Sequence, residues 1–415
     1  MRTLGEWLAF IERQHPKAIA LGLERVAAVF HRMQVKLTSP VITVAGTNGK
    51  GSCSALLEAM LRAGGYRTGL YTSPHLMRYN ERVRVSGIEA SDRELCESFE
   101  AVEAARGDIA LTYFEYGTLA ALWLFARENI EAAVLEVGLG GRLDAVNIVD
   151  ADCAVLTSLG IDHVDYLGAD RESIGREKAG IFRADRPAVI AEPQPPQSVL
   201  QAPGLHYLLG KDFGYADQPG QWMYWGPAGK RGGLAPPALR GAIQLRNAAA
   251  AMCALDCLRD KLPLGMQDVR RRLAEVSLPA RFQVLPGRPQ VILDVAHNPQ
   301  AAQVLAENLA TSGFAPETIA VCGMLRDKDI AAVFAALAPR ITRWHLASLS
   351  GPRAASAEEL AVHVQGTLEC FDSPASAFAA ALSRANENDK IVVFGSFLTV
   401  GEVMEWLKNN KTSKR

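Results

Sequence analysis

VITVAGTNGKGSCSALLEAMLRA, residues 41–63, is the stretch that decides the fold. Its first five residues, VITVA, are typical of a short buried strand. Its second half places four apolar side chains between positions 56 and 61 with the spacing of a helix face, and a pair of glycines follows the helix pattern. The stretch therefore predicts a strand, a glycine-rich turn and a helix in succession.

The turn, VAGTNGKGS at residues 44–52, predicts a phosphate-binding loop. Its three glycines allow the backbone to fold closely around an anion, and the helix dipole with its free N–H groups favours phosphate. Lys50 adds a positive charge and Ser52 is placed to ligate magnesium. The strict Walker form has a glycine and a hydroxyl residue where this loop has Val44 and Gly51, so the loop is a variant. The alternative is a glycine-rich turn with an exposed lysine.

Outward from this loop, strands and helices alternate, which favours a mostly parallel sheet covered by helices. Residues 193–240 break the alternation with a stretch dense in Pro and Gly, which predicts turns and short antiparallel strands. A Pro/Gly-rich junction at 285–289 precedes a second alternating series. We therefore expect an α/β protein of two domains, residues 1–286 and the smaller 287–415.

Composition narrows the class of ligand. The chain has 415 residues, 44 Lys plus Arg against 45 Asp plus Glu, and a net charge of -1, so no polyanionic partner such as nucleic acid is expected. Seven cysteines without a CxxC pair suit reduced thiols. Glu6 and Glu12 interrupt any signal peptide, and no apolar run is long enough to span a bilayer. These features predict a cytoplasmic protein that acts on small molecules.

Two further strand ends of the first domain offer metal ligands. Glu136 ends a buried strand, where a carboxylate beside a phosphate loop suits magnesium. A solvated cap is the alternative. Asp162, His163 and Asp165 follow the next strand and could supply or orient a second ligand, although a single His in a loop is more often a surface residue.

For two other residues the sequence pattern alone does not decide the role. Lys178 lies on a predicted helix, where the pattern favours a solvated lysine. Asp294 ends the first strand of the second domain, an edge where open α/β sheets bind ligands. Its alternative role is to cap the helix that Pro299 opens.

Taken together, eight motifs resemble the folylpolyglutamate synthase and dihydrofolate synthase family, which is related to the Mur ligases of cell-wall synthesis. In chain order they are GTNGKGS (46–52), TSPHLMRYNERV (72–83), FEYGTLAAL (114–122), LEVGLGGRLDAVN (135–147), LTSLGIDHVDYLG (156–168), REKAGIF (176–182), LPARFQ (278–283) and DVAHNP (294–299). The resemblance spans nearly the whole chain. One departure is Ile243, where the family commonly has a His before Gln244.

The resemblance implies a P-loop ATPase-like N-terminal domain, with helices on both faces of a mostly parallel sheet, and a smaller Rossmann-like C-terminal domain. It implies an ATP-dependent ligase that adds L-glutamate to the carboxylate of 7,8-dihydropteroate or a reduced folate through an acyl phosphate. ATP and Mg²⁺ at two sites would be the cofactors. A monomer with small-molecule partners only, without nucleic acid or membrane, is expected.

The resemblance also implies roles residue by residue. The nucleotide would be bound by Thr47, Asn48, Gly49, Lys50, Gly51, Ser52, Asn247, Arg281 and Asp294, and magnesium by Ser52, Ser73, Glu136 and His163. Lys178 would be carbamylated and, with Lys50 and His297, catalytic. The pterin and glutamate contacts would come from Gly22, Leu23, Glu24, Arg25, Thr112, Tyr113, Phe114, Glu115, Leu143, Asp144, Ala145 and Ser396.

Three alternatives remain. A Mur-type ligase would share the loop and both domains but usually adds an N-terminal domain for a UDP-sugar, for which the roughly 40 residues before the loop leave no room. A kinase or simple NTPase would leave Lys178 and the second domain without a role. A non-catalytic nucleotide-binding regulator would bind ATP without glutamate-dependent release of ADP.

Overall fold

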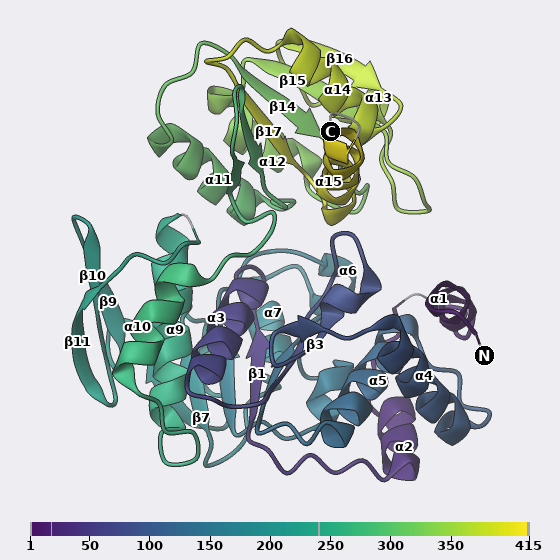
Figure 1. Cartoon of the computed structure of the whole chain (residues 1–415), viewed down its shortest axis with the longest axis vertical. Coiled ribbons are helices and arrows are strands. Elements are labelled where there is room, and N and C mark those ends of the chain that lie inside the picture. The colour runs from purple at the N-terminus through teal and green to yellow at the C-terminus, as the bar shows by residue number, and fades with distance from the viewer. Residues whose placement is uncertain (1, 18, 240, 413–415) are drawn as a thin grey trace. The chain divides into compact units, whose positions relative to one another are not determined.

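The computed structural model describes residues 2–17, 19–239 and 241–412, and they form two compact units (Figure 1). The first unit takes the residues up to His75, then Tyr79–Ala238 and Gln244–Val276. The second takes Leu76–Arg78, Leu239–Ile243 and the residues from Ser277 onward. The chain therefore enters the second unit twice for a few residues before it stays there.

The first unit is built on an eight-stranded sheet in the order β4-β3-β2-β5-β1-β6-β7-β8. The six strands from β2 to β8 in this order are parallel, and β3 and β4 extend the sheet in antiparallel pairing. The predicted mostly parallel sheet is confirmed. The bounds are β1 (Val41–Ala45), β2 (Thr68–Tyr71), β3 (Val83–Val85), β4 (Ile88–Glu89), β5 (Ala132–Glu136), β6 (Cys153–Leu156), β7 (Pro187–Ile190) and β8 (Leu205–Leu208).

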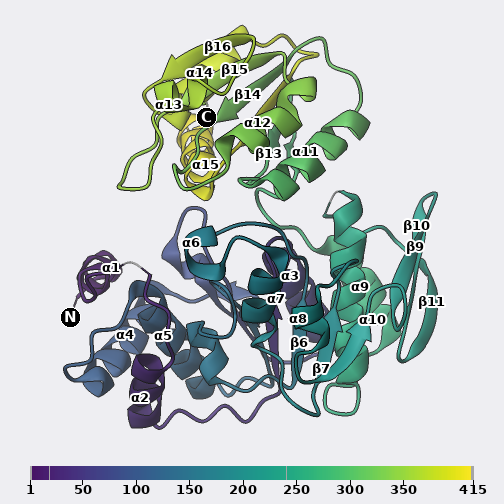
Figure 2. The same ribbon diagram turned by 180° about the vertical axis from the view of Figure 1, so that it is seen from behind.

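Helices cover both faces of this sheet, as Figure 2 shows from behind. Val41 and Ala45 of β1 pack into the core beneath α4 and α5, whereas alternate side chains of a strand point the other way, towards α3. The helix predicted after the glycine-rich turn begins before its apolar pattern, at Lys50. The bounds are α1 (Leu4–Glu12), α2 (Glu24–Met33), α3 (Lys50–Ala63), α4 (Asp92–Arg106), α5 (Tyr113–Arg127), α6 (Val164–Leu167), α7 (Arg171–Ala179), α8 (Gln197–Leu200), α9 (Ala242–Cys257) and α10 (Met266–Glu275), with 3-10 turns η1 (Tyr79–Arg82) and η2 (Ala145–Ile148).

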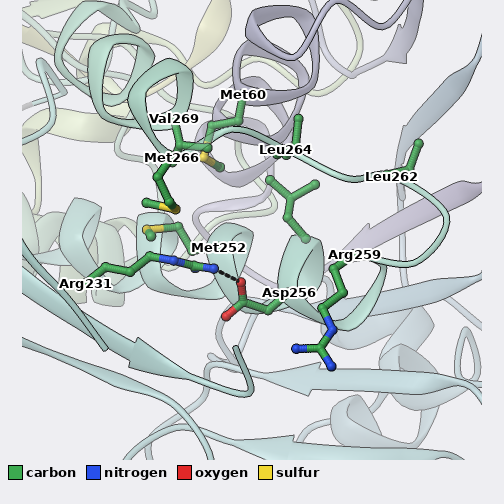
Figure 3. Close-up of a pocket in the computed structure, with 10 residues that line it drawn as sticks. Met60, Arg231, Met252, Asp256, Arg259, Leu262, Leu264, Met266 and Val269 are labelled. Atoms are coloured by element: carbon green, nitrogen blue, oxygen red, sulfur yellow. Dashed lines mark ion pairs between the residues drawn. The ribbon is translucent and has the colours of Figure 1, made fainter. Parts of the chain in front are cut away.

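A three-stranded antiparallel sheet of β9 (Gly214–Gln218), β10 (Gln221–Gly226) and β11 (Gly229–Leu234) follows β8. Asp256 of α9 anchors it, because it accepts a hydrogen bond from the Tyr224 hydroxyl at 2.7 Å and pairs with Arg231 at 2.6 Å. Figure 3 shows this ion pair in a small pocket lined mainly by apolar side chains, including Met252 and Met266. The contacts tie the small sheet to the helices of the first unit.

The second unit has a six-stranded sheet in the order β12-β13-β17-β14-β15-β16, in which only the β12 edge is antiparallel. Its central strand alternates: Ile391 and Val393 face α14 and α15, and Val392 and Phe394 face α11 and α12. The elements are β12 (Gln283–Leu285), β13 (Gln290–Leu293), α11 (Pro299–Thr311), β14 (Thr318–Cys322), α12 (Ile330–Leu337), η3 (Ala338–Arg340), β15 (Arg343–Ala347), α13 (Ala357–Ala361), β16 (Thr367–Phe371), α14 (Pro374–Arg384), β17 (Lys390–Phe394) and α15 (Phe397–Thr412).

Two further observations concern the cysteines and the lengths of the helices. All seven cysteines are free thiols. Among the helices of the described residues, none has the length and apolarity that a membrane crossing requires.

Candidate functional site

The loop between β1 and α3 needs its glycines because other chain segments approach it closely. Gly49 is the residue before α3 and has φ +86°, a left-handed conformation that side chains rarely adopt. A Cβ there would lie 2.7 Å from the Asn247 side-chain oxygen. At Gly46, with φ +152°, a Cβ would lie 2.0 Å from the Thr157 hydroxyl. The predicted strand, turn and helix are therefore present, and Asn247 lies against the loop.

The segment after β6 holds the loop in place. The Thr47 and Asn48 amides donate to the carbonyl and hydroxyl of Ser158, at 2.8 and 3.0 Å. The Thr157 hydroxyl donates to the Asn48 carbonyl at 2.7 Å, and the Thr47 hydroxyl donates to the Gly160 carbonyl at 3.1 Å. The sequence reasoning did not single out Thr157 and Ser158. Two adjacent hydroxyl residues directly after a buried strand were the signal that could have found them.

Two lysines converge on this loop. Lys50 donates to the carbonyls of Gly46 and Thr47, at 3.1 and 3.3 Å, and Lys178 donates to the same Gly46 carbonyl at 3.2 Å. Lys178 is only 5% exposed. Burial, and next the charge of Lys50, lower the pKa of Lys178 from 10.5 to about 7. The interpretation of Lys178 as a solvated lysine was wrong, because α7 packs its end against the phosphate loop.

Three of the four proposed metal ligands in the first unit would bind through oxygen atoms. Glu136 ends β5, beside β1, and is 3% exposed, and its carboxylate accepts from the Ser73 amide at 3.2 Å. Ser52 is buried in the first turn of α3. Burial raises the pKa of the Cys53 thiol and the charge of Glu136 raises it further, so this carboxylate lies close to the start of α3. Oxygen ligands suit the preference of magnesium.

The backbone of His163 has a left-handed conformation, which is unusual for this residue type. It has φ +53°, its amide donates to Asp162 at 2.8 Å, and its side chain is 29% exposed. No group of three or more His, Cys, Asp or Glu side chains that could hold a metal is found within the described residues. A magnesium site here would therefore depend on serine hydroxyls as well as Glu136 and His163.

The three segments with expected pterin contacts come together in the first unit. The Gly22 amide donates to the Leu143 carbonyl at 3.4 Å. Arg25 at the start of α2 pairs at 2.9 Å with Glu115 in the first turn of α5, whose N-cap is Thr112. The segments around residues 22, 112 and 143 thus form one region, although they are far apart in the sequence.

Asp144 holds the loop after β5. Its carboxylate accepts from the Leu139 amide at 2.8 Å and the Val146 amide at 3.1 Å. Burial raises the pKa of Asp144 to about 7, against the opposing effect of these hydrogen bonds and of Lys50. This carboxyl group therefore changes its protonation near neutral pH.

In the second unit, the Asp294 carboxylate binds two backbone amides from different segments. Its carboxylate accepts from the amides of Phe282 and Ala296, both at 2.8 Å. Burial raises the pKa of Asp294, and the charge of nearby Arg281 opposes this. The alternative interpretation of Asp294 as the cap of α11 was wrong, because the Asn298 side chain caps that helix by accepting from the Ala301 amide at 2.9 Å.

Arg281, His297 and Ser396 gather at the start of α15. The Arg281 guanidinium lies 5.5 Å from the centre of the Phe397 ring, and the His297 ring lies 6.3 Å from it. His297 Nδ1 is 2.8 Å from the Val295 carbonyl. The Ser396 hydroxyl accepts from the Thr399 amide at 3.0 Å. The second unit thus groups the residues that the resemblance singled out there.

Comparison with known proteins supplies the family. The Mur ligase middle domain family matches residues 44–195, and the Mur ligase glutamate ligase domain family matches residues 280–397. The chain is 47% identical over 407 residues to the dihydrofolate synthase/folylpolyglutamate synthase of Escherichia coli K12, covering 97% of this chain and 95% of the relative. It is 41% identical to the protein of that name from Haemophilus influenzae, covering 96% of each.

Solved structures of proteins with these names are also similar to this chain. Escherichia coli FolC in complex with DHPP and ADP is similar with a TM-score of 0.94 at 46% identity, over 99% of both chains. A bifunctional folylpolyglutamate synthase/dihydrofolate synthase from Yersinia pestis, complexed with AMPPNP and a Mn ion, is similar with a TM-score of 0.91 at 46% identity, over 98% of both chains.

Proposed function

Because the chain belongs to the dihydrofolate synthase/folylpolyglutamate synthase family of Mur ligases, we propose that it joins L-glutamate to the carboxylate of 7,8-dihydropteroate and of reduced folates, with hydrolysis of ATP to ADP and phosphate. It is an ATP-dependent ligase that uses a divalent cation. The observation that carries the proposal is the convergence of Lys50 and Lys178 on the Gly46 carbonyl, beside the buried Glu136.

The phosphate loop suits the first half of the reaction. A carboxylate does not react with an amine, so it is first converted to an acyl phosphate, which has a good leaving group. Lys50 offsets the charge of the transferring phosphoryl group, and the backbone N–H groups at the start of α3 add to this. Positioning and charge are the main contributions that a protein makes to phosphoryl transfer. The glutamate amine then displaces the phosphate to form the amide.

We assign magnesium to Ser52, Ser73, Glu136 and His163. Ser52 and Glu136 are buried near the start of α3, and the oxygen donors of Ser52, Ser73 and Glu136 fit a hard cation. When bound, the ion neutralises charge on the phosphates. The left-handed backbone of His163 supports a functional role, since such strain is retained at sites that need it.

Carbamylation of Lys178 is the next part of the proposal. The unprotonated amine attacks carbon dioxide, which forms a carbamate and releases one proton. A pKa of about 7 leaves much of Lys178 unprotonated at neutral pH, as this reaction requires. The product would be an anion beside Lys50 in place of a second cation, which would relieve their repulsion.

The remaining contacts complete the assignment. We assign Thr47 to Ser52, Asn247, Arg281 and Asp294 to the nucleotide, and His297 and Ser396 to the glutamate or phosphate side. The pterin is assigned to residues 22–25, 112–115 and 143–145, which hydrogen bonds bring together. Balanced charge and free thiols support a cytoplasmic protein without nucleic-acid or membrane partners, and we propose a monomer from the resemblance to other ligases of the family alone.

The test measures release of ADP by the purified protein in the presence of ATP, magnesium and L-glutamate. Dihydropteroate is added in one assay and tetrahydrofolate in another. Release with both establishes two activities, and release with one alone establishes a single activity. Binding of ATP without glutamate-dependent release in either case would refute the ligase and favour a nucleotide-binding regulator.

A further inference from the structure

An ion pair connects two of the segments assigned to the pterin. Arg25, the second residue of α2, places its guanidinium 2.9 Å from the Glu115 carboxylate in the first turn of α5. The Glu115 side chain is 4% exposed and the Arg25 side chain is 30% exposed. The pair bridges 90 residues of sequence. It is therefore a long-range contact with one buried partner.

Each partner is also bonded to backbone. The same Arg25 nitrogen donates to the Ala20 carbonyl at 2.8 Å, which places the segment before α2. The other Glu115 oxygen accepts from the Thr112 amide at 2.7 Å, in the capping box that starts α5. A continuous series of hydrogen bonds therefore runs from Ala20 through both side chains to Thr112.

This series fixes geometry where the chain lacks regular structure. Residues 19–23 lie between α1 and α2, outside any helix or strand. They also contact the pterin region through a hydrogen bond from the Gly22 amide to the Leu143 carbonyl, at 3.4 Å. At that length the Gly22 bond is weak. Arg25 and Glu115 thus provide the stronger restraint on these residues.

We propose that Arg25 and Glu115 are positioning residues that hold residues 19–23 on the first turn of α5, so that both segments present one preformed surface to the pterin. They act through these segments and do not contact the substrate themselves. Both carboxylate oxygens of Glu115 are already engaged, by Arg25 and by Thr112. This inference rests on the proposed function and changes the role expected of these two residues from binding to positioning.

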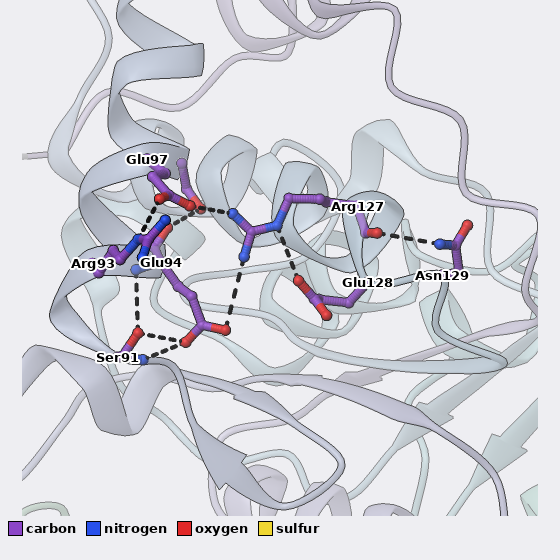
Figure 4. A network of polar contacts seen from close by, with 8 residues as sticks. Ser91, Arg93, Glu94, Glu97, Arg127, Glu128 and Asn129 are labelled. Atoms are coloured by element: carbon purple, nitrogen blue, oxygen red, sulfur yellow. Dashed lines mark hydrogen bonds and ion pairs between the residues drawn. The ribbon is translucent and has the colours of Figure 1, made fainter.

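A matched control lies at the start of α4, shown in Figure 4. Glu94 completes a capping box with Ser91, as Glu115 does with Thr112, and Arg127 approaches it to 3.8 Å. Glu94 is 36% exposed, and Arg127 also pairs with Glu97 and Glu128 at 2.6 and 3.0 Å. The same local motif is thus present at the surface, with alternative partners for the arginine.

The experiment is a double-mutant cycle of Arg25→Ala and Glu115→Gln, with dihydropteroate as the varied substrate in the ADP-release assay. Glutamine keeps an acceptor for the Thr112 amide but removes the charge that faces Arg25. We expect each single variant to raise the KM for dihydropteroate about tenfold, with kcat within about threefold and the KM for ATP unchanged. The double variant should be no worse than about the worse single variant, because both changes break one connection.

Arg127→Ala and Glu94→Gln should leave the KM for dihydropteroate unchanged. If Arg25→Ala does not fold, Arg25→Lys replaces it in the cycle, and it should raise this KM about threefold because an amine cannot reproduce the geometry of the guanidinium.

Two results would overturn the proposal. If the single effects multiply to about a hundredfold in the double variant, the two residues contact the substrate independently. If the KM stays at the wild-type value while the thermal stability falls, the pair is only structural. Failure of the wild-type protein to release ADP with either pterin would instead refute the proposed function, so the two failures are distinguishable.

Discussion

Each unit buries a lysine beside the backbone carbonyl of a glycine, but the surroundings differ. Lys178 donates to Gly46 at 3.2 Å and shares that carbonyl with Lys50. Lys390, 6% exposed at the start of β17, donates to the Gly313 carbonyl and to the Ser312 hydroxyl at 2.9 Å, directly after α11. Burial lowers the pKa of both lysines.

The difference separates the lysine that we assign to the site from a structural one. Lys390 offsets the partial negative charge at the end of a helix, which is a structural task. Lys178 lies near a second cation, Lys50, which adds to the lowering of its pKa. Burial alone therefore does not distinguish a site lysine from a structural one, whereas a second cation at the same carbonyl does.

Replacement of Lys50 is expected to have the largest effect on activity. Lys50→Ala should lower the rate of glutamate-dependent ADP release by about 10³-fold, because it removes the fixed charge that faces the transferring phosphoryl group. Lys390→Met, measured in the same assay, should stay within about twofold of wild type. A Lys50→Ala protein that keeps more than about a tenth of the activity would contradict the assigned role.

Replacing Lys178 should lower the rate of ADP release by a smaller factor, and a small carboxylic acid should restore part of that rate. Lys178→Ala is expected to lower ADP release about 100-fold, and added formate or acetate should restore part of it, because a small carboxylate can occupy the space of the carbamate. Lys390→Met should show no response to these acids. Absence of rescue over a range of acid concentrations would count against carbamylation.

The pH dependence of stability should follow the lowered pKa of Lys178. Between about 7 and the ordinary value of 10.5 the unfolded chain binds a proton that the folded chain does not, so the free energy of unfolding rises with pH. The contribution is at most about 1.4 kcal/mol per pH unit. Relative to Lys178→Met, the wild-type protein should therefore gain about 2 kcal/mol from pH 7.5 to 9, measured by urea unfolding in buffer depleted of carbon dioxide. Parallel pH profiles of the two proteins would show that Lys178 keeps an ordinary pKa.

The smallest effect is expected for the structural lysine. Lys390→Met should lower the free energy of unfolding by about 1 kcal/mol, because the bonds to the end of α11 are lost and the apolar side chain still fills the space. The KM values for all three substrates should not change. A rise in the KM for glutamate would show that Lys390 takes part in binding and would remove the contrast between the two lysines.

Local features of the site could be predicted from the sequence. The strand, the glycine turn and the helix of residues 41–63 are adjacent in the chain, and the left-handed Gly49 can be occupied by few other residues. The position of Glu136 at the end of a buried strand was predicted for the same reason, since the strand is an apolar run. In each case the pattern that predicts the structure lies within about ten residues of the residue concerned.

Long-range features could not be predicted in this way. The environment of Lys178 depends on Gly46, 132 residues away, and that of Arg25 on Glu115, 90 residues away. At Asp294 two local interpretations were balanced, and the structure shows that its carboxylate accepts a hydrogen bond from the Phe282 amide, 12 residues away. Contacts of this kind depend on the tertiary fold and leave no periodic pattern in the sequence.

The two short excursions of the chain into the second unit have a consequence for modularity. Residues 76–78 pack there so closely that a side chain added at Gly401 would approach the Leu76 carbonyl to 2.3 Å, and residues 239–243 also belong to that unit. A single recombination point near residue 277 would therefore exchange an incomplete module. Chimeras with relatives should fold best when residues 76–78 and 239–243 come from the same parent as the C-terminal segment, so these distant positions should be inherited together.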